Sequence, residues 1–223
     1  MISNLLLKSG LTKKITRARM DKFLARHQDA QSLTLDLGCG PHAPYAKYFP
    51  NRVGFDIVSG PGVDVVGDAH NLPFENDKFD LILCTDVLDH LHSPQVVIRE
   101  MQRVLKPGGK VISITRFVFP LHDVPHDYYR FTKYGLRYLF RDWEILELSE
   151  EANTIETIAV IFQRIGYQCE VLRLKPLKMV FLIAARILQP LSFILTKQFG
   201  DISSKNEETN ILVSGYYMVC KKL

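Results

Sequence analysis

Two glycines and an aspartate in the first third of the chain have the spacing of a ligand site at the end of a parallel sheet. Gly38 and Gly40 follow the apolar run Leu33–Leu37, which predicts a buried strand, and glycine lets the backbone turn sharply close to a ligand. Asp56 lies sixteen residues after Gly40, near the end of the next predicted strand. A carboxylate there can accept hydrogen bonds from both hydroxyls of a ribose, so the pattern predicts a nucleotide-like ligand.

The charge beside the glycines helps to decide which nucleotide binds. Gly38, Gly40 and Ala43 satisfy the dinucleotide pattern GxGxxG/A, but that pattern alone is weakly specific. Asp36 places a carboxylate two residues before Gly38, which suits a ligand with an ammonium or sulfonium charge better than a pyrophosphate. Asp68 can accept a hydrogen bond from an adenine amino group. An NAD-dependent oxidoreductase is therefore disfavoured.

A second group of chemically active side chains follows the strand predicted at 110–115. It comprises His122, Asp123, His126, Asp127 and Arg130. Open α/β sheets bind ligands at this edge, and imidazole is the side chain best suited to accept a proton near neutral pH. His122 or His126 is therefore the predicted general base, with Asp123 or Asp127 orienting the ring and Arg130 binding an anionic group.

Two other interpretations of this group remain open. Asp127 and Arg130 can form an internal salt bridge that pins the loop without touching a substrate. His122 and His126 are four residues apart, as metal ligands on a helix often are, but Pro125 lies between them and disfavours a helix. We therefore predict no metal site.

The remaining pattern predicts the elements that position these residues. Short apolar segments predict strands and amphipathic segments predict helices in alternation, which indicates a doubly wound parallel sheet. The strands are expected at 33–37, 52–57, 80–84, 110–115, 144–148 and 211–220, the helices at 12–27, 44–49, 94–105, 133–140 and 153–164, and an extended segment at 168–174. Pro107-Gly108-Gly109 predicts a tight turn and Gly215 a bulge. His90 and His92 follow the strand at 80–84 and could touch the acceptor, but are expected rather to pack or to face solvent.

As a set, these motifs resemble the class I S-adenosylmethionine-dependent methyltransferases, and in particular the small type related to quinone-biosynthesis enzymes. The resemblance covers residues 33–149 and the final strand. It implies an α/β, doubly wound, mostly parallel seven-stranded sheet with an antiparallel edge hairpin. It also implies S-adenosyl-L-methionine as cofactor, bound by the following residues: Asp36, Gly38, Cys39 and Gly40 at the methionine end, Asp56 and Ile57 at the ribose, Asp68 and Ala69 at the adenine, and Cys84 through its backbone.

One position departs from the family's glycine-rich turn. His42 stands where the family usually has a third glycine. This departure leaves open a non-catalytic, methyltransferase-like binding protein.

The resemblance also bears on the methyl acceptor. The segment 122–132, HDVPHDYYRFT, is similar to that of bacterial methyltransferases associated with surface-polysaccharide assembly. The leading hypothesis is methyl transfer to a hydroxyl of a sugar or of a glycan or lipid-linked precursor. The alternative is methylation of a small aromatic or quinone-like molecule.

Composition and the C-terminal third bound the remaining expectations. The chain of 223 residues predicts a single domain with a helical insertion at about 175–200. Residues 177–199 are almost continuously apolar, but Arg186 and Pro190 disfavour a membrane span. An amphipathic helix split near Pro190 is expected, its apolar face on the domain or on a membrane.

The same features suggest a compartment and partners. A net charge of +4 without a strongly basic block does not indicate nucleic acid, and the four cysteines are not spaced for disulfides or zinc. Met1–Leu7 lacks the features of a signal peptide. We expect a cytoplasmic protein, and residues 175–199 leave open a peripheral contact with the inner face of a membrane. The sequence does not indicate an oligomeric state.

Overall fold

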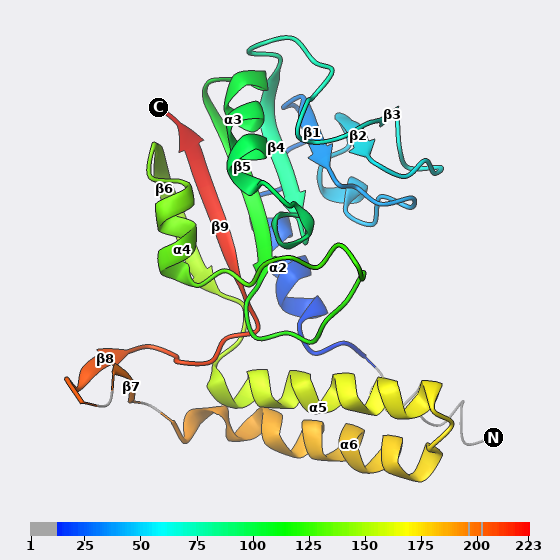
Figure 1. The fold of residues 1–223 in the computed structure, drawn as a ribbon, viewed down its shortest axis with the longest axis vertical. Coiled ribbons are helices and arrows are strands. Elements are labelled where there is room, and N and C mark those ends of the chain that lie inside the picture. Colours follow the sequence, from blue (N-terminus) through cyan, green and yellow to red (C-terminus); the bar gives the residue numbers. More distant parts are fainter. Residues whose placement is uncertain (1–12, 196, 202) are drawn as a thin grey trace. The chain divides into compact units, whose positions relative to one another are not determined.

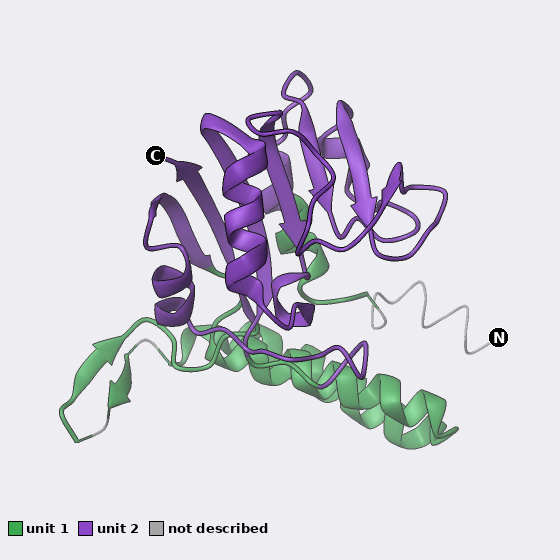
Figure 2. Ribbon diagram, turned by 45° about the horizontal axis from the view of Figure 1, so that its top comes forward, with its two compact units in different colours: residues 1–21, 118–120, 150–214 green, residues 22–117, 121–149, 215–223 purple. Residues whose placement is uncertain are grey.

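The computed structural model describes residues 13–195, 197–201 and 203–223, so the interpretation of Met1–Leu7 lies outside the described residues. Contacts between Cα atoms divide the chain into two compact units, drawn in different colours in Figure 2. The first contains residues 1–21, 118–120 and 150–214, and the second contains 22–117, 121–149 and 215–223.

The second unit is built on a seven-stranded sheet with the order β3-β2-β1-β4-β5-β9-β6 (Figure 1). Parallel pairing joins β3, β2, β1, β4 and β5, and β9 runs antiparallel to β5. The strands are β1 Thr34–Leu37, β2 Arg52–Asp56, β3 Val65–Val66, β4 Phe79–Thr85, β5 Leu105–Arg116, β6 Trp143–Glu150 and β9 Gly215–Lys222. The sheet confirms the predicted fold class.

Helices of this unit follow the apolar periodicity of the sequence. In α3 (Pro94–Val104), Val97, Ile98, Met101 and Val104 are buried at the spacing of one helix face. Thr132 caps α4 (Lys133–Leu139) by accepting a hydrogen bond from the backbone of Gly135. Helix α2 (Arg17–Arg26) begins later than the predicted residue 12, and the segment 44–49 forms only the short helix η1 (Ala46–Tyr48).

Two glycine predictions need correction. Gly215 does not form a bulge, because it pairs in register with Arg116, and a Cβ there would lie 2.3 Å from the carbonyl oxygen of Thr115. The expected turn Pro107–Gly109 lies within β5, where the register shifts opposite Phe79 and Leu81. Position 215 requires glycine because the neighbouring backbone approaches it closely. Position 108 requires glycine because its φ is +75°.

The first unit contains two long helices, α5 (Thr154–Val171) and α6 (Lys175–Leu188). A reciprocal capping box between Asn153 and Glu156 starts α5. The expected extended segment 168–174 is wrong, because α5 continues to Val171. At Gly166 a Cβ would lie 3.1 Å from Leu182 Cδ2, so the glycine allows α6 to pack closely against the C-terminal part of helix α5.

The rest of the first unit continues α6. The short helix η3 (Gln189–Phe193) begins where α6 ends, so the helix changes character next to Pro190 as expected. Strands β7 (Gln198–Asp201) and β8 (Asn206–Glu208) pair antiparallel. Ile15, Ala159, Val160 and Ala185 form a buried apolar cluster within this unit.

The thiols lie in both units, and all are buried. Cys39, Cys84 and Cys220 belong to the sheet unit, and Cys169 lies on α5. Burial raises the pKa of Cys39 to about 11 and that of Cys220 to about 12. These two thiols are therefore protonated in the folded protein, and all four are shielded by burial.

Candidate functional site

The turn after β1 is shaped by two glycines in the left-handed region. Gly38 has φ of +69° and Gly40 has φ of +68°. The backbone N–H of Gly38 donates to the carbonyl of Phe55 at 2.8 Å, which ties the turn to β2. A Cβ on Gly38 would lie 2.3 Å from Val87 Cγ2, whereas nothing lies within 4 Å of a Cβ on Gly40. Gly38 is thus required by space and conformation, and Gly40 by conformation alone.

Asp56 at the end of β2 closes this turn from the neighbouring strand. One of its carboxylate oxygens accepts the backbone N–H of Gly40 at 2.8 Å, and the other accepts that of Val58 at 2.9 Å. A carboxylate oxygen has two acceptor sites, so each can take one further hydrogen bond. His42, which replaces the third glycine, is exposed.

Asp36 lies behind the turn and is 1% exposed. Its carboxylate lies 3.5 Å from Arg52 Nη1 and accepts no hydrogen bond from the described residues. Burial raises the pKa of Asp36 to about 6, although Arg52 opposes that rise. Asp36, Cys39, Gly40 and Cys84 are not among the residues that line the adjoining cavity. An effect of Asp36 on a ligand must therefore act through its charge or through the backbone of the turn.

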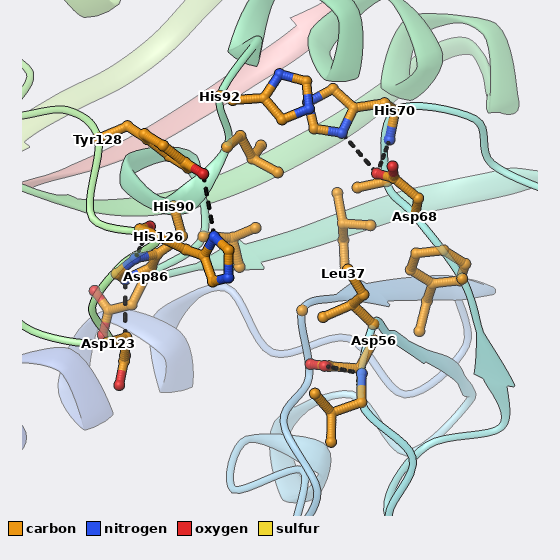
Figure 3. A pocket seen from close by; sticks show the side chains of 18 of the residues that line it. Leu37, Asp56, Asp68, His70, Asp86, His90, His92, Asp123, His126 and Tyr128 are labelled. Atoms are coloured by element: carbon orange, nitrogen blue, oxygen red, sulfur yellow. Dashed lines mark hydrogen bonds and ion pairs between the residues drawn. The ribbon is translucent and has the colours of Figure 1, made fainter.

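A cavity of about 620 Å³ opens in front of this turn. Its volume lies in the range of small-molecule sites. Its lining includes Leu37, Gly38, Asp56, Ile57, Asp68, Ala69, Asp86, Val87, His90, Leu91, His92, Asp123, His126 and Tyr128. Figure 3 shows the pocket from close by and labels its polar side chains together with Leu37. We call the part formed by Leu37, Gly38, Asp56, Asp68 and Ala69 the glycine end, and the part formed by His90, His92, Asp123, His126 and Tyr128 the imidazole end.

A stack of two imidazoles connects the two ends. The rings of His70 and His92 lie 4.0 Å apart and nearly parallel, with 9° between their planes. Asp68 fixes His70, because its Oδ1 accepts the backbone N–H of His70 at 2.9 Å and lies 2.6 Å from its Nδ1. These bonds lower the pKa of Asp68. Asp68 lines the cavity, as the expected contact with adenine requires, and is partly engaged by His70.

The imidazole end is assembled from η2 (Leu88–His90) and the loop 121–130. The backbone N–H groups of Tyr128 and Tyr129 both donate to the carbonyl of Asp89, at 2.9 and 3.1 Å. Nδ1 of His90 lies 2.9 Å from the carbonyl oxygen of His126. These backbone contacts hold the loop against η2, although the two segments are far apart in the sequence.

His126 and His122 occupy different places in this loop. His126 lines the cavity, and its Nδ1 lies 3.1 Å from the hydroxyl of Tyr128. His122 is not among the cavity-lining residues. Its Nδ1 lies 3.5 Å from Asp127 and its Nε2 lies 3.6 Å from Asp89. Of the two predicted bases, His126 is the one that can meet a ligand in the cavity.

Asp127 and Arg130 are engaged with each other. Arg130 donates to both carboxylate oxygens of Asp127, at 2.5 and 2.7 Å, and the side chain of Asp127 is 1% exposed. Asp127 also accepts the backbone N–H of His122 at 3.0 Å. The guanidinium holds the pKa of Asp127 well below its usual range. This arrangement favours the interpretation that the pair pins the loop, and neither residue lines the cavity.

The sequence interpretation missed Asp86 and preferred packing or solvent to an acceptor contact for His90 and His92. Asp86 lies directly after β4 with φ of +56° and pairs with Arg116 at 2.7 Å, and His90 and His92 face the cavity rather than only solvent or core. A signal was present for all three. They follow the C-terminal end of β4, which is the neighbour of β1 in a parallel sheet, so they emerge beside the glycine turn.

Comparisons with known proteins agree with this geometry. Residues 35–113 match the family model described as a methyltransferase domain. A demethylmenaquinone methyltransferase from Paenarthrobacter aurescens is 31% identical over 151 residues, which cover 62% of this chain and 57% of that protein. The chain spans about half the length of the curated relatives it matches.

Solved structures share the fold at low sequence identity. A Burkholderia thailandensis 1,6-didemethyltoxoflavin-N1-methyltransferase, with bound substrate and S-adenosylhomocysteine, has a TM-score of 0.55 and 14% identity and covers 95% of this chain and 80% of its own. The [4+2]-cyclase SpnF has a TM-score of 0.59 and 16% identity, with 92% and 80% covered. Since a cyclase shares the fold, the fold alone does not establish the reaction. The match over residues 35–113 and the seven-stranded sheet make this chain similar to the class I S-adenosylmethionine-dependent methyltransferases.

Proposed function

We propose that this protein transfers the methyl group of S-adenosylmethionine to a hydroxyl of a sugar or of a glycan or lipid-linked precursor. The observation that supports the proposal is one cavity with two chemically different ends. The glycine end offers carboxylates and backbone turns for a nucleoside, and the imidazole end offers proton acceptors for a hydroxyl. The cavity has room for a cofactor and at least part of an acceptor.

The glycine end fits S-adenosylmethionine. Both oxygens of Asp56 keep an acceptor site after binding the Gly40 and Val58 amides, which suits the two ribose hydroxyls. Ile57 is 72% exposed beside it and can cover an adenine ring. The buried carboxylate of Asp36 favours a positive charge in front of the turn.

The imidazole end fits an acceptor that must lose a proton. When bound, the cofactor supplies an activated methyl group on a sulfonium. The protein then has to hold the acceptor oxygen in line with that carbon and to accept the hydroxyl proton as the C–O bond forms and the C–S bond breaks. His126 is the proposed base, with Tyr128 contacting its Nδ1 so that Nε2 is available toward the cavity.

A quinone-like acceptor is the second candidate. The similarity to demethylmenaquinone methyltransferases favours it, because it extends over more than half of this chain. Leu91 and Val87 in the cavity wall offer apolar contacts for a ring. An acceptor assay with both chemical classes separates the two candidates.

We also propose that the helices α5 and α6 bring the protein to the cytoplasmic face of an anionic membrane. Leu177, Val180, Ile183 and Ile187 form an exposed apolar stripe along α6. Arg173 and Lys175 are exposed at its start. Among the described residues, Lys175–Phe193 is long and apolar enough to cross a membrane, but composition alone is weak evidence for that. A helix lying in the interface uses the same features.

Calorimetric titration with S-adenosylhomocysteine tests the cofactor site. The wild-type protein is expected to bind with micromolar affinity, roughly −8 kcal/mol. Asp56→Ala should weaken binding about 100-fold, because it removes charge-assisted hydrogen bonds. Asp142→Ala, on an exposed side chain, should bind like the wild type. Binding of NADH instead, or no binding to folded protein, would overturn the proposal.

Methyl transfer is then measured with labelled S-adenosylmethionine against nucleotide sugars, glycolipids and hydroquinones. Label in a sugar ether supports the first candidate, and label in the hydroquinones alone supports the second. His126→Gln should lower turnover about 100-fold with unchanged S-adenosylhomocysteine affinity, whereas His42→Gln should leave turnover unchanged. Cofactor binding without transfer to any acceptor would favour a non-catalytic binding protein.

Flotation with vesicles tests the membrane proposal. Vesicles with anionic lipid should carry the wild-type protein, and a variant with Ile183→Ser and Ile187→Ser should remain behind. Equal behaviour of the two proteins, or no flotation, contradicts the proposal. Because both side chains are exposed, the variant is expected to fold.

A further inference from the structure

Two histidines at the imidazole end point toward one carboxylate. Nε2 of His90 lies 3.7 Å from Oδ2 of Asp89, and Nε2 of His122 lies 3.6 Å from the same oxygen. The two imidazole rings are arranged edge to face, with centroids 4.7 Å apart. With Asp127, these groups place one ligand atom each within 4.8 Å of one another.

The opposite nitrogen of His90 is held by an acceptor, and that of His122 faces a carboxylate without forming a hydrogen bond to it. Nδ1 of His90 lies 2.9 Å from the carbonyl oxygen of His126, and Nδ1 of His122 lies 3.5 Å from Asp127. An acceptor at Nδ1 favours the tautomer with its proton there, which directs a lone pair from Nε2. Metal-binding histidines are oriented in this way by carboxylates and backbone carbonyls.

Asp89 supplies an independent reason to expect a ligand. It is 0% exposed, and neither carboxylate oxygen accepts a hydrogen bond from any described residue. The two Nε2 atoms are too far away for hydrogen bonds. A buried carboxylate that faces two imidazole nitrogens without hydrogen-bonding to them favours a cation between them.

We propose that Asp89, His90 and His122 bind a divalent transition-metal ion of the zinc class at the wall of the cavity. Two imidazoles and a carboxylate are a common ligand set for such ions, and it leaves a coordination position open. Ligand atoms on a tetrahedral ion with bonds of about 2.0 Å lie about 3.3 Å apart. The separations between Asp89 and the two imidazole nitrogens, 3.6 and 3.7 Å, are a few tenths of an ångström longer, and small side-chain rotations would shorten them.

Asp127 and Asp123 have different parts in this site. Asp127 is held by Arg130 and positions His122 by accepting its backbone N–H, without being needed as a ligand. Asp123 lines the cavity, with its Oδ2 3.8 Å from Nε2 of His90 and its side chain 80% exposed. Because His90 lines the cavity, an ion bound to it would lie at the cavity wall, where an oxygen of an acceptor could reach it. That contribution to acceptor binding rests on the proposed function, whereas metal binding itself does not.

Titration of the full chain, after removal of metal with a chelator, tests the site. Zn²⁺ should bind with a stoichiometry of one and at micromolar affinity or tighter. Co²⁺ in its place should give the visible absorption of a four- or five-coordinate ion. His122→Gln should weaken Zn²⁺ binding more than about 100-fold, and Asp127→Asn about 10- to 100-fold, as loss of an orienting group does.

Three controls keep the result interpretable. His42→Gln changes an exposed histidine outside the site and should bind Zn²⁺ like the wild type. Asp89→Asn repeats the test at the buried ligand, and thermal melting shows whether each variant is folded. S-adenosylhomocysteine titration of the same metal-free protein reports the cofactor site separately, so failure of one proposal is distinguished from failure of the other. Zn²⁺ binding that is unchanged in folded His122→Gln and Asp89→Asn, or an octahedral Co²⁺ spectrum, would overturn the inference.

Discussion

The glycine end and the imidazole end of the cavity are held in place by different kinds of interaction. At the glycine end, strand termini present a backbone turn, and one carboxylate on the neighbouring strand fixes it through the amide of Gly40. At the imidazole end, a long loop is held by backbone bonds to Asp89 and by a partly buried ion pair. The first end depends on conformation and space, and the second on charges whose partners must all be present.

The largest effect should come from breaking the ion pair at the imidazole end. Arg130→Ala leaves the covered carboxylate of Asp127 without its cation, which should lower the free energy of unfolding by about 3 kcal/mol or more. Chemical denaturation measures this, with Arg141→Ala on an exposed side chain as the matched control. A loss below about 1 kcal/mol would mean that the pair does not pin the loop.

At the glycine end, Asp36 should make stability depend on pH. Its pKa of about 6 in the folded protein exceeds the ordinary value of 3.8, so the folded state binds the proton more tightly. Asp36 therefore does not lower the free energy of unfolding below about pH 4, where it is protonated in both states. It lowers that free energy by the full amount above about pH 6, where it is ionised in both states. Each pKa unit is about 1.4 kcal/mol, so the cost is about 2–3 kcal/mol.

Asp36→Asn removes this titration and serves as its own comparison. Relative to the wild type, the free energy of unfolding of the variant should rise by about 2–3 kcal/mol between pH 4 and pH 7. Urea denaturation at several pH values measures it. A difference that stays constant across the range contradicts a raised pKa.

The two glycines should differ because only one is crowded. Gly38→Ala combines a left-handed backbone with a Cβ 2.3 Å from Val87, and should cost about 2–3 kcal/mol. Gly40→Ala has the same conformation but open space, and should cost about 1 kcal/mol. Thermal or chemical denaturation of both variants gives the comparison, and equal losses would show that space does not distinguish the positions.

The smallest effect concerns the stack that joins the ends. His70→Ala, His92→Ala and the double variant form a cycle whose coupling energy should be about 0.5–1 kcal/mol, as for other stacked rings. Denaturation of the three variants and the wild type provides it. A coupling energy of zero would mean that the two ends are energetically independent.

The same difference decides what could be predicted from the sequence. Gly38, Gly40, Asp56 and Asp68 could be placed because consecutive strand ends of a parallel sheet meet at one edge, so spacing along the chain becomes position in space. The imidazole end could not be assembled in this way, because Asp89 and the loop 121–130 meet through backbone bonds that no spacing encodes.

Packing accounts for the other differences. The end of α5 has residues that predict an extended segment, but the close approach of α6 at Gly166 favours a continued helix. Similarly, a glycine at position 215 is compatible with a bulge, but in the structure Gly215 allows the backbone of β9 to approach that of β5 closely. In both cases tertiary contacts decide between local structures that the sequence permits.

The reactivity of the buried cysteines can report local unfolding of the two units. Because Cys39, Cys84 and Cys220 lie in the sheet unit and Cys169 in the helical unit, each unit carries a thiol that a reagent reaches only when its surroundings open. Peptide mapping after brief alkylation would therefore time the opening of each unit separately, in one sample and without any engineered label. A bound cofactor should slow alkylation of Cys39, which follows Gly38 directly, more than that of Cys169.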